Sequence, residues 1–398
     1  MIISENKIPF ILKIAILTYF IVAFNPDIRV HSMFWYIITV TTSLLMLSYL
    51  IAFKMLKPNR YVWWLVIFNL WCLISIYWAL DQESTINSLK TAFAQMIIFI
   101  PLSMLIRNKD GLYEIIKLVV LAIIITSIYL IMNIDRSMIG QTQITAEGWN
   151  ANSIGMMTAT AVLFSFAIIK KGVPKFKFLF YIIAIFFLGY VSLFSGSRKS
   201  LFILLAGIAL YYFLTSKNNK IIVASGLTGF IFLSYYLIMT VPELYKVLGI
   251  RVERMLNQVT GQGVVDSSTR TRMLMIDYGI TWFKQNPLIG YGLNNYRTLL
   301  GRATGRTTYS HNNYVELLVG VGVIGTFIYY YIYVHIIRKL FKFARKKEIT
   351  AALFFALMVV LVIIEYGLVS YYGNLMQLVV CLGYVATQVK EQKYVNKS

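Results

Sequence analysis

The segment at residues 241–316 begins VPELYKVLGI and ends SHNNYVE, and the apolar spans of the chain are arranged around it. Residues 241–312 are the only long interruption in an otherwise continuous series of apolar spans. They hold nine of the 37 Lys and Arg residues, and an apolar run, LLVGVG at residues 317–322, follows closely. The preceding spans place this segment on one side of a membrane. Any chemistry is therefore expected in this segment and in the short loops on the same side.

The composition requires a membrane. Of the 398 residues, 59% are hydrophobic and the mean hydropathy is +0.70, which is more apolar surface than a soluble domain can bury. Apolar runs of about 20 residues recur along the chain. They predict helices rather than the alternating strands of a barrel. Cys72 and Cys381 fall inside apolar runs, so they provide neither a disulfide framework nor a metal-ligand spacing.

We predict an all-α polytopic membrane protein, a single integral domain over residues 1–398 with about twelve transmembrane helices. A large, partly helical extracytoplasmic loop separates helices nine and ten. The predicted spans are residues 8–24, 33–53, 61–79, 92–106, 113–133, 151–169, 176–194, 200–216, 220–240, 314–336, 350–369 and 374–389. The fourth span is short and contains Pro101, which is expected to kink or tilt it. The first is not interpreted as a signal peptide, because no small-residue cleavage site follows it.

The distribution of basic residues predicts the orientation. With the N-terminus inside, the cytoplasmic segments hold 23 Lys and Arg residues and the short outer loops hold five. Both termini are therefore expected in the cytoplasm and the loop at residues 241–312 outside. The net charge of +21 is then explained by anchoring at the membrane, and no nucleic-acid partner is expected.

The long loop is expected to be partly helical, because a structureless segment of this length is unusual. Apolar residues at three- and four-residue steps predict a helix over residues 243–259, lying on the outer surface. A second helix is predicted to start after Ser267-Ser268, which act as its cap, and to run to Gln285, where the Asn-Pro pair that opens a turn at residues 286–292 ends it. A third begins at Asn313, whose side chain can cap it, with Glu316 resembling the partner in a capping box.

Four polar groups of sequence share the predicted outer face. They are residues 147–155, residues 195–199, the arginines of the loop and residues 310–316. The loop arginines are Arg251, Arg254, Arg270, Arg272, Arg297, Arg302 and Arg306. Positive charge concentrated on one outer surface suits an anionic substrate, and planar guanidinium groups suit phosphate in particular.

Each of these residues also has a structural explanation. Arg198 and Lys199 could anchor a span at the lipid headgroups, and Arg270 could form an ion pair along its own helix. His311 could be a polar residue near a helix cap. Glu365 lies in an apolar span, where an acid is a functional candidate, but it could instead neutralise a neighbouring arginine.

At these motifs the sequence resembles the bacterial O-antigen ligase and polysaccharide (O-antigen) polymerase family. Residues 195–198 (SGSR) resemble the Ser-Gly-Ser-Arg turn of that family, and residues 286–292 (NPLIGYG) its Asn-Pro-x-x-Gly-x-Gly turn. Residues 310–316 resemble its His-Asn-x-x-x-Glu helix start, and residues 150–155 (NANSIG) are similar to its Asn-x-Asn-x-x-Gly segment. The predicted topology, with about twelve spans and a large outer loop between spans nine and ten, resembles that of the family over nearly the whole chain. The four motifs occur in the right order and on the same side.

The resemblance implies a glycosyltransferase of the cytoplasmic (inner) membrane with an extracytoplasmic active face. Its donor is an oligosaccharide on undecaprenyl diphosphate, and neither a cofactor nor a metal is expected. His311 and Arg198 are the expected catalytic residues, His311 as the base for the acceptor hydroxyl and Arg198 as a neutraliser of diphosphate charge. The expected substrate-binding residues are Arg270, Arg272, Arg302, Lys199, Asn152, Asn312 and Glu316.

Two activities fit this resemblance. A polymerase joins repeat units on the carrier lipid into a surface polysaccharide, whereas a ligase transfers finished glycan to lipid A core, protein or a wall polymer. The motifs do not separate the two, and we favour a polymerase because no acceptor-specific feature is visible. A flippase and a chain-length regulator are then expected partners, beside a glycan or lipid acceptor and membrane lipids.

A polysaccharide transporter or flippase is a remote alternative. Many transporters are built from two matching halves, and this sequence shows no matching halves. Transport also gives no reason for an outer loop of 72 residues with nine basic side chains.

Overall fold

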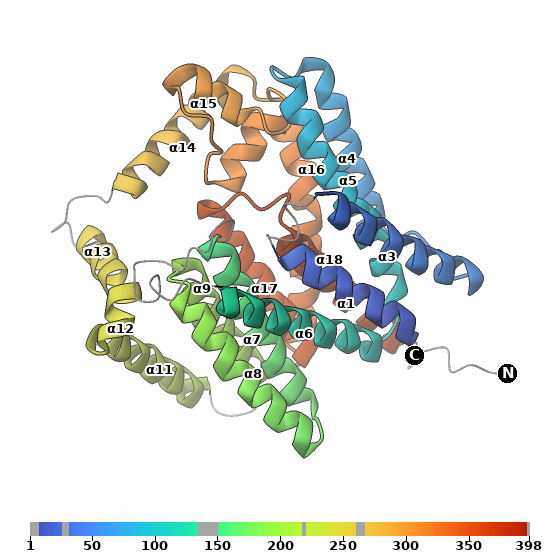
Figure 1. Ribbon diagram of the computed structural model, residues 1–398, viewed down its shortest axis with the longest axis vertical. Helices are drawn as coiled ribbons and strands as arrows, with labels where there is room; N and C mark the ends of the chain where they lie inside the picture. The colour runs from blue at the N-terminus through green and yellow to red at the C-terminus, as the bar shows by residue number, and fades with distance from the viewer. Residues whose placement is uncertain (1–7, 26–31, 134–149, 217–219, 260–266, 396–398) are drawn as a thin grey trace.

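The computed structural model describes residues 8–25, 32–133, 150–216, 220–259 and 267–395, and within these ranges it contains helices and no strand. Figure 1 shows the helices. The first half of the chain forms α1 (Phe10–Phe24), α3 (Ser32–Ala52), α4 (Arg60–Ile74), α5 (Gln82–Leu105), α6 (Lys109–Asn133), α7 (Ala151–Lys171) and α8 (Lys175–Phe194). The second half forms α9 (Arg198–Phe202), α10 (Ile208–Thr215), α11 (Lys220–Thr240), α12 (Pro242–Leu244), α13 (Ile250–Val259), α14 (Ser267–Gln285), α15 (Tyr296–Thr304), α16 (Asn313–Ala344), α17 (Ile349–Ile364) and α18 (Asn374–Val395). Short 3-10 turns extend α4 and α17, and π-helical turns join α9 to α10 and α12 to α13.

Nine helical segments in the described part of the chain are long and apolar enough to cross a membrane. They are Met33–Ala52, Arg60–Trp78, Gln82–Leu105, Lys109–Asn133, Ala151–Lys171, Lys175–Phe194, Arg198–Thr215, Asn313–Ala344 and Ile349–Gly367. Two shorter apolar helices, Phe10–Phe24 and Asn374–Val389, accompany them. Every predicted span overlaps helix, so the all-helical membrane class is confirmed. The number of twelve stays a prediction.

The fourth predicted span was wrong at its start. Helix α5 begins at Gln82, ten residues before the predicted boundary, because its first turns are polar and escape a search for apolar runs. Asp81 caps it by accepting a hydrogen bond from the backbone N–H of Ser84 at 2.9 Å. Pro101 cannot donate to the carbonyl of Ile97, and the hydroxyl of Ser43 donates to that carbonyl instead, at 2.7 Å.

Helix α7 is the most buried of the membrane-spanning helices. Of its apolar segment 78% is buried, against 28% for the neighbouring α8, so α7 lies inside the bundle and α8 at its edge. Small residues allow this position, since α8 and α9 approach α7 closely. A Cβ atom on Gly155 would lie 2.4 Å from the Ser195 hydroxyl oxygen, so no larger residue fits there.

Helix α16 is broken, although the sequence predicted a continuous span. Gly322 has φ 68° and ψ −174°, which ends one helical segment and starts another. The turn predicted at residues 286–292 fills the break: the N–H groups of Tyr291 and Gly292 donate to the carbonyls of Val319 and Gly320, at 2.9 and 2.8 Å. The N–H of Val323 donates in return to a carbonyl of the same turn at 2.8 Å. A break inside a membrane-spanning helix is stable only when its freed backbone groups find such partners.

Glycine is required on both sides of this junction. Gly290 and Gly292 have φ of 67° and 99°, and a Cβ on Gly322 would lie 2.2 Å from the carbonyl oxygen of Leu288. The Gly-x-Gly pattern at residues 290–292 therefore joins the end of the outer loop to α16.

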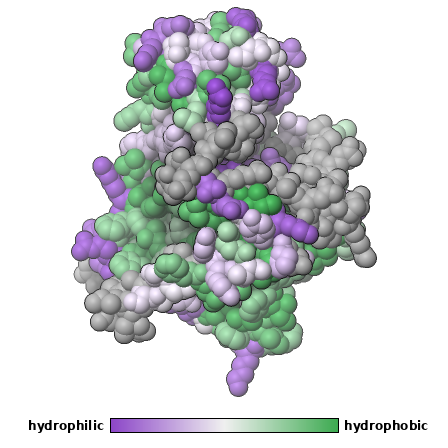
Figure 2. Space-filling model, turned by 90° about the vertical axis from the view of Figure 1, so that its left-hand side faces the viewer, coloured by the Kyte–Doolittle hydropathy of each residue, from purple (hydrophilic) through white to green (hydrophobic). Residues whose placement is uncertain are grey.

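The helices predicted within the outer loop are present. Helix α14 ends at Gln285 as predicted but begins at Ser267, so the two serines predicted to cap it lie inside the helix. Helix α12, a π-helical turn and α13 together cover residues 242–259. Helix α15 was not predicted, because its sequence, YRTLLGRAT, is short and contains an internal glycine. Hydrophilic residues predominate at the end of the molecule that carries α15, above a largely hydrophobic body (Figure 2).

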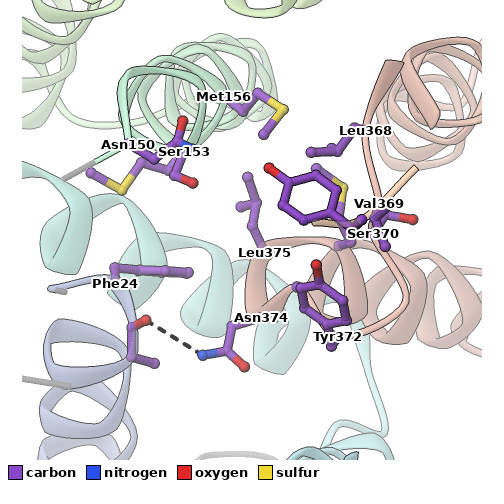
Figure 3. A pocket seen from close by; sticks show the side chains of 15 residues that line it. Phe24, Asn150, Ser153, Met156, Leu368, Val369, Ser370, Tyr372, Asn374 and Leu375 are labelled. Atoms are coloured by element: carbon purple, nitrogen blue, oxygen red, sulfur yellow. Dashed lines mark hydrogen bonds between the residues drawn. The ribbon is translucent and has the colours of Figure 1, made fainter. Parts of the chain in front are cut away.

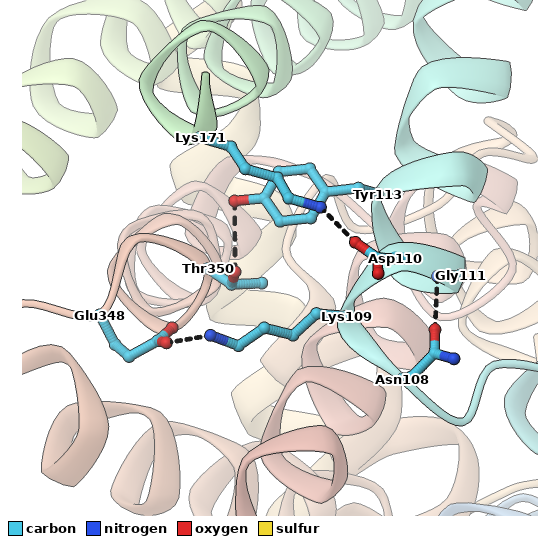
Figure 4. Close-up of polar contacts among 8 residues, drawn as sticks. All are labelled: Asn108, Lys109, Asp110, Gly111, Tyr113, Lys171, Glu348 and Thr350. Carbon is cyan, nitrogen blue, oxygen red and sulfur yellow. Dashed lines mark hydrogen bonds and ion pairs between the residues drawn. The ribbon is translucent and has the colours of Figure 1, made fainter. Parts of the chain in front are cut away.

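Three loops that the charge pattern placed on the inner side meet at one end of the bundle (Figure 4). Lys109 pairs with Glu348 at 2.5 Å, and Lys171 pairs with Asp110 at 2.6 Å. The hydroxyl of Thr350 donates to that of Tyr113 at 3.3 Å, which ties α6 to α17. The predicted inner loops thus share one end, as the alternating topology requires, and which compartment this end faces stays a prediction.

Candidate functional site

His311 lies in a tight turn directly before α16. Its φ of 57° is in the left-handed region. The hydroxyl of Ser310 donates to the carbonyl of Asn312 at 2.7 Å, and the N–H of Asn312 donates back to that hydroxyl at 3.2 Å. Asn312 is buried, and its side chain accepts hydrogen bonds from the N–H groups of Tyr314 and Val315 at 3.0 and 3.1 Å. The cap of α16 is therefore Asn312, and the prediction that Asn313 caps it was wrong.

The side chain of Asn313 is used elsewhere. Its amide donates to the Tyr330 hydroxyl at 3.0 Å, and its oxygen accepts from the N–H of Ser370 at 2.9 Å. The bond to Ser370 holds the start of α16 against the segment that joins α17 to α18.

Glu316 is a buried support of the His311 turn. Only 2% of the residue is exposed, and its Oε2 accepts a hydrogen bond from the N–H of Ser310 at 2.8 Å. A capping-box residue would bond the N–H of the cap itself. Glu316 instead fixes Ser310, the residue before His311 and two residues before the cap.

The Ser-Gly-Ser turn between α8 and α9 lies against the start of α7. The Ser197 hydroxyl donates to the side-chain oxygen of Asn152 at 2.9 Å, and Ser197 also caps α9. Gly196 has φ 64°, which a residue with a side chain rarely adopts. Two of the predicted motifs, residues 150–155 and residues 195–198, are therefore one structural unit that orients Arg198 and Lys199 at the first turn of α9.

Cations from distant parts of the sequence gather around His311. Lys199 interacts electrostatically with Arg198 and with Arg272 of α14, and its aliphatic chain lies beside Gly367. Burial, followed by the charges of Arg272 and Lys199, lowers the pKa of His311 from 6.5 to about 4. His311 is therefore neutral at pH 7, with a ring nitrogen able to accept a proton.

Two of the predicted binding residues are more exposed than Arg272. Arg270 lies exposed on α14, and Arg302 lies exposed on α15. The neighbouring charges that lower the pKa of His311 are those of Arg272 and Lys199. Successive helical residues are 100° apart, so Arg270 points away from the face that carries Arg272. Within the described ranges no group of three or more His, Cys, Asp or Glu side chains could hold a metal ion.

A cavity of about 340 Å³ lies between α7, α18 and the segment that joins α17 to α18 (Figure 3). Its lining residues are Ala23, Phe24, Asn150, Ser153, Met156, Met157, Tyr309, Leu368, Val369, Ser370, Tyr372, Gly373, Asn374, Leu375 and Met376. Apolar side chains of α7 and α18 form much of the wall, and Asn150, Ser153 and Ser370 are polar groups at it. The ring of Tyr309 joins the cavity to His311, because the two ring centroids are 4.3 Å apart.

One interpretation of the sequence allowed Glu365 to neutralise an arginine, but within the described ranges its hydrogen-bond partners are hydroxyl groups. It is fully buried and accepts hydrogen bonds from the hydroxyls of Tyr330, Ser370 and Tyr333 at 2.7, 2.5 and 3.2 Å. Sequence reasoning missed these tyrosines, which resemble ordinary interfacial aromatic residues in an apolar span. Their hydroxyls satisfy both oxygens of the acid, as burial requires.

Residues 182–330 match the O-antigen ligase family. This match confirms the resemblance that the motifs predicted. It runs from α8 into α16 and contains residues 195–199, the outer loop and His311. The O-antigen ligase match indicates an activity of the ligase or polymerase type in a membrane protein. No curated protein matches the chain.

Proposed function

We propose that this protein is a membrane glycosyltransferase that polymerises oligosaccharide repeat units carried on undecaprenyl diphosphate. The observation that carries the proposal is that the charges of Arg272 and Lys199 act on His311, with Arg198 beside Lys199. The ring of Tyr309, which contacts the His311 ring, lines a partly apolar cavity. Such a site suits a donor with a lipid chain, a diphosphate and a sugar, and it lies within the O-antigen ligase match.

The proposed reaction divides the work between His311 and the cations. A ring nitrogen of His311 takes the proton of the acceptor hydroxyl, whose oxygen bonds to the anomeric carbon of the donor sugar. The bond from that carbon to the diphosphate oxygen breaks, and its electron pair leaves with the carrier. Arg272, Lys199 and Arg198 stabilise the charge that develops on the leaving diphosphate.

We expect the bound donor to raise the pKa of His311. Burial, followed by the charges of Arg272 and Lys199, lowers the pKa of His311, which makes it a weak base. A diphosphate placed among the same cations would offset their charge and raise that pKa towards neutrality. His311 would then become a stronger base when the donor is in place.

A ligase is the second candidate, favoured by the description of the matching family as O-antigen ligases. It would use the same donor chemistry and a different acceptor. Purified protein supplied with the lipid-linked repeat unit alone separates the two: a ladder of longer lipid-linked products indicates a polymerase. Transfer only after addition of lipid A core, protein or a wall polymer indicates a ligase.

His311→Asn tests the site itself. Asparagine tolerates the left-handed φ of 57° better than most residues, so the turn should survive while the base is lost. We expect transfer to fall by 10²- to 10⁴-fold while the protein still binds the lipid-linked donor. If the asparagine variant transfers at the normal rate, His311 is only structural and the assignment fails.

A further inference from the structure

A second cavity, of about 390 Å³, lies between the start of α5 and α15. Its lining residues are Asp81, Glu83, Ser84, Asn87, Arg297, Thr298 and Thr307. All seven are polar or charged, in contrast to the largely apolar cavity of Figure 3. None of them belongs to the motifs that resemble the O-antigen ligase and polymerase family.

The walls of this cavity are fixed by hydrogen bonds between elements far apart in sequence. The Asn295 side chain accepts from the N–H of Asp81 at 2.6 Å and donates to the Thr85 hydroxyl at 2.8 Å. The Thr298 hydroxyl donates to the Asp81 carboxylate at 3.2 Å, and the Asn294 amide donates to the Ser84 hydroxyl at 3.1 Å. The start of α5 and α15 therefore form one preorganised unit, which lowers the cost of ordering the site around a ligand.

The chemistry of the lining favours carbohydrate. Glu83 and Asn87 are four residues apart and share one exposed face of α5. A carboxylate accepts hydrogen bonds, an amide both donates and accepts, and the Thr307 hydroxyl does both. This mixture complements sugar hydroxyls, which also donate and accept. With two carboxylates and one guanidinium on its walls, the cavity lacks the excess positive charge of the His311 cluster.

The cavity is connected to His311. Thr307 lies four residues before His311, so their Cα atoms are within about 14 Å of each other. Arg297, at the cavity wall, interacts electrostatically with Glu316, which in turn accepts a hydrogen bond from the N–H of Ser310. A short oligosaccharide could therefore occupy this cavity while its terminal hydroxyl reached His311.

We infer that the cavity between α5 and α15 is a subsite for the acceptor glycan, and that it holds a neutral sugar beyond the reacting residue. The inference rests on the proposed transferase function for the identity of the reacting end. It assigns glycan recognition to α5 and α15, and diphosphate recognition to α9 and α14.

The test compares Glu83→Gln and Asn87→Ala with Gln82→Ala, an exposed neighbour on α5 that does not line the cavity. The probe is a carrier-free oligosaccharide released by mild acid from the surface polysaccharide of the host. Its binding to the detergent-solubilised full chain is measured by calorimetry, and transfer kinetics are measured with the acceptor varied. We expect three- to tenfold weaker binding for each cavity variant, as for the loss of one hydrogen bond. The acceptor KM should rise by the same factor, kcat should stay unchanged, and Gln82→Ala should behave as wild type.

The outcomes separate the two proposals. If wild type transfers glycan but the cavity variants bind the oligosaccharide as wild type does, the subsite inference is wrong and the proposed function stands. If wild type binds the oligosaccharide through this cavity but makes no glycosidic bond, the subsite is supported and the transferase function fails. The inference would also be wrong if wild type bound no oligosaccharide at oligosaccharide concentrations up to tens of millimolar. That limit is set by the weak binding expected of a single-sugar subsite.

Discussion

Replacing Arg272 with glutamine should raise the pKa of His311. In the folded protein that pKa is about 4 instead of 6.5, with burial as the largest cause and the charge of Arg272 as the next. At about 1.36 kcal/mol per pKa unit, the site disfavours the imidazolium by on the order of 3 kcal/mol. Glutamine removes one of the two charges and leaves the burial, so we expect a rise of about 0.5 to 1 unit.

The direction of this change in the pKa of His311 determines the expected change in the pH profile of kcat/KM. A base with a pKa near 4 is neutral throughout the range above pH 5, so the profile of wild-type kcat/KM should be flat there and fall only below about pH 4. A pKa of about 5 in Arg272→Gln would move this acid limb upward. At pH 4.5 the neutral fraction of His311 would then drop from about three quarters to about a quarter.

The position of the acid limb is the informative measurement, because Arg272→Gln should also lower the maximal rate through weaker diphosphate binding. The pKa can be measured independently by NMR of labelled histidine in a variant in which His311 is the only one of the three histidines left. Arg270→Gln is the matched control: it removes the same charge two residues away on α14, from an exposed position. That variant should leave the limb where it is in wild type.

Two results would refute this reasoning. A wild-type limb near pH 6.5 would mean that neither burial nor the neighbouring cations shift the pKa of His311. An identical shift in Arg270→Gln and Arg272→Gln would mean that His311 responds to net charge and not to the particular arrangement of α14 and α9.

Three further predictions follow from other parts of the structure. Arg198→Lys should lose nearly as much transferase activity as Arg198→Ala, because an ammonium lacks the planar fork of a guanidinium, and full activity of the lysine variant would support a mere membrane anchor. Gly322→Ala should lower the thermal unfolding temperature, since its φ is 68° and its Cβ would lie 2.2 Å from a carbonyl oxygen, whereas Gly189→Ala, with open space around it, should not. In a version without the native cysteines, cysteine at Arg306 should react with an impermeant thiol reagent in intact cells and cysteine at Lys346 should not; the opposite pattern would invert the topology.

The sequence by itself determined the class and the candidates. In a bilayer, apolar runs of membrane-spanning length can pair their own backbone N–H and C=O groups only as helices. The all-helical architecture therefore follows from hydropathy alone. Local signals were also sufficient for α14, whose polar start and Asn-Pro end lie within the segment itself. The four motifs led to the O-antigen ligase resemblance, and the resemblance pointed to His311 and Arg198.

Tertiary structure decided which candidates act together. No local signal distinguishes Arg272 from Arg270, and only the packing of α14 against α16 places one of them beside His311. The break at Gly322 likewise depends on a turn some 30 residues away that supplies the missing backbone partners. Both features rest on contacts between segments distant in sequence. Hydropathy and spacing describe each segment separately and cannot contain such contacts.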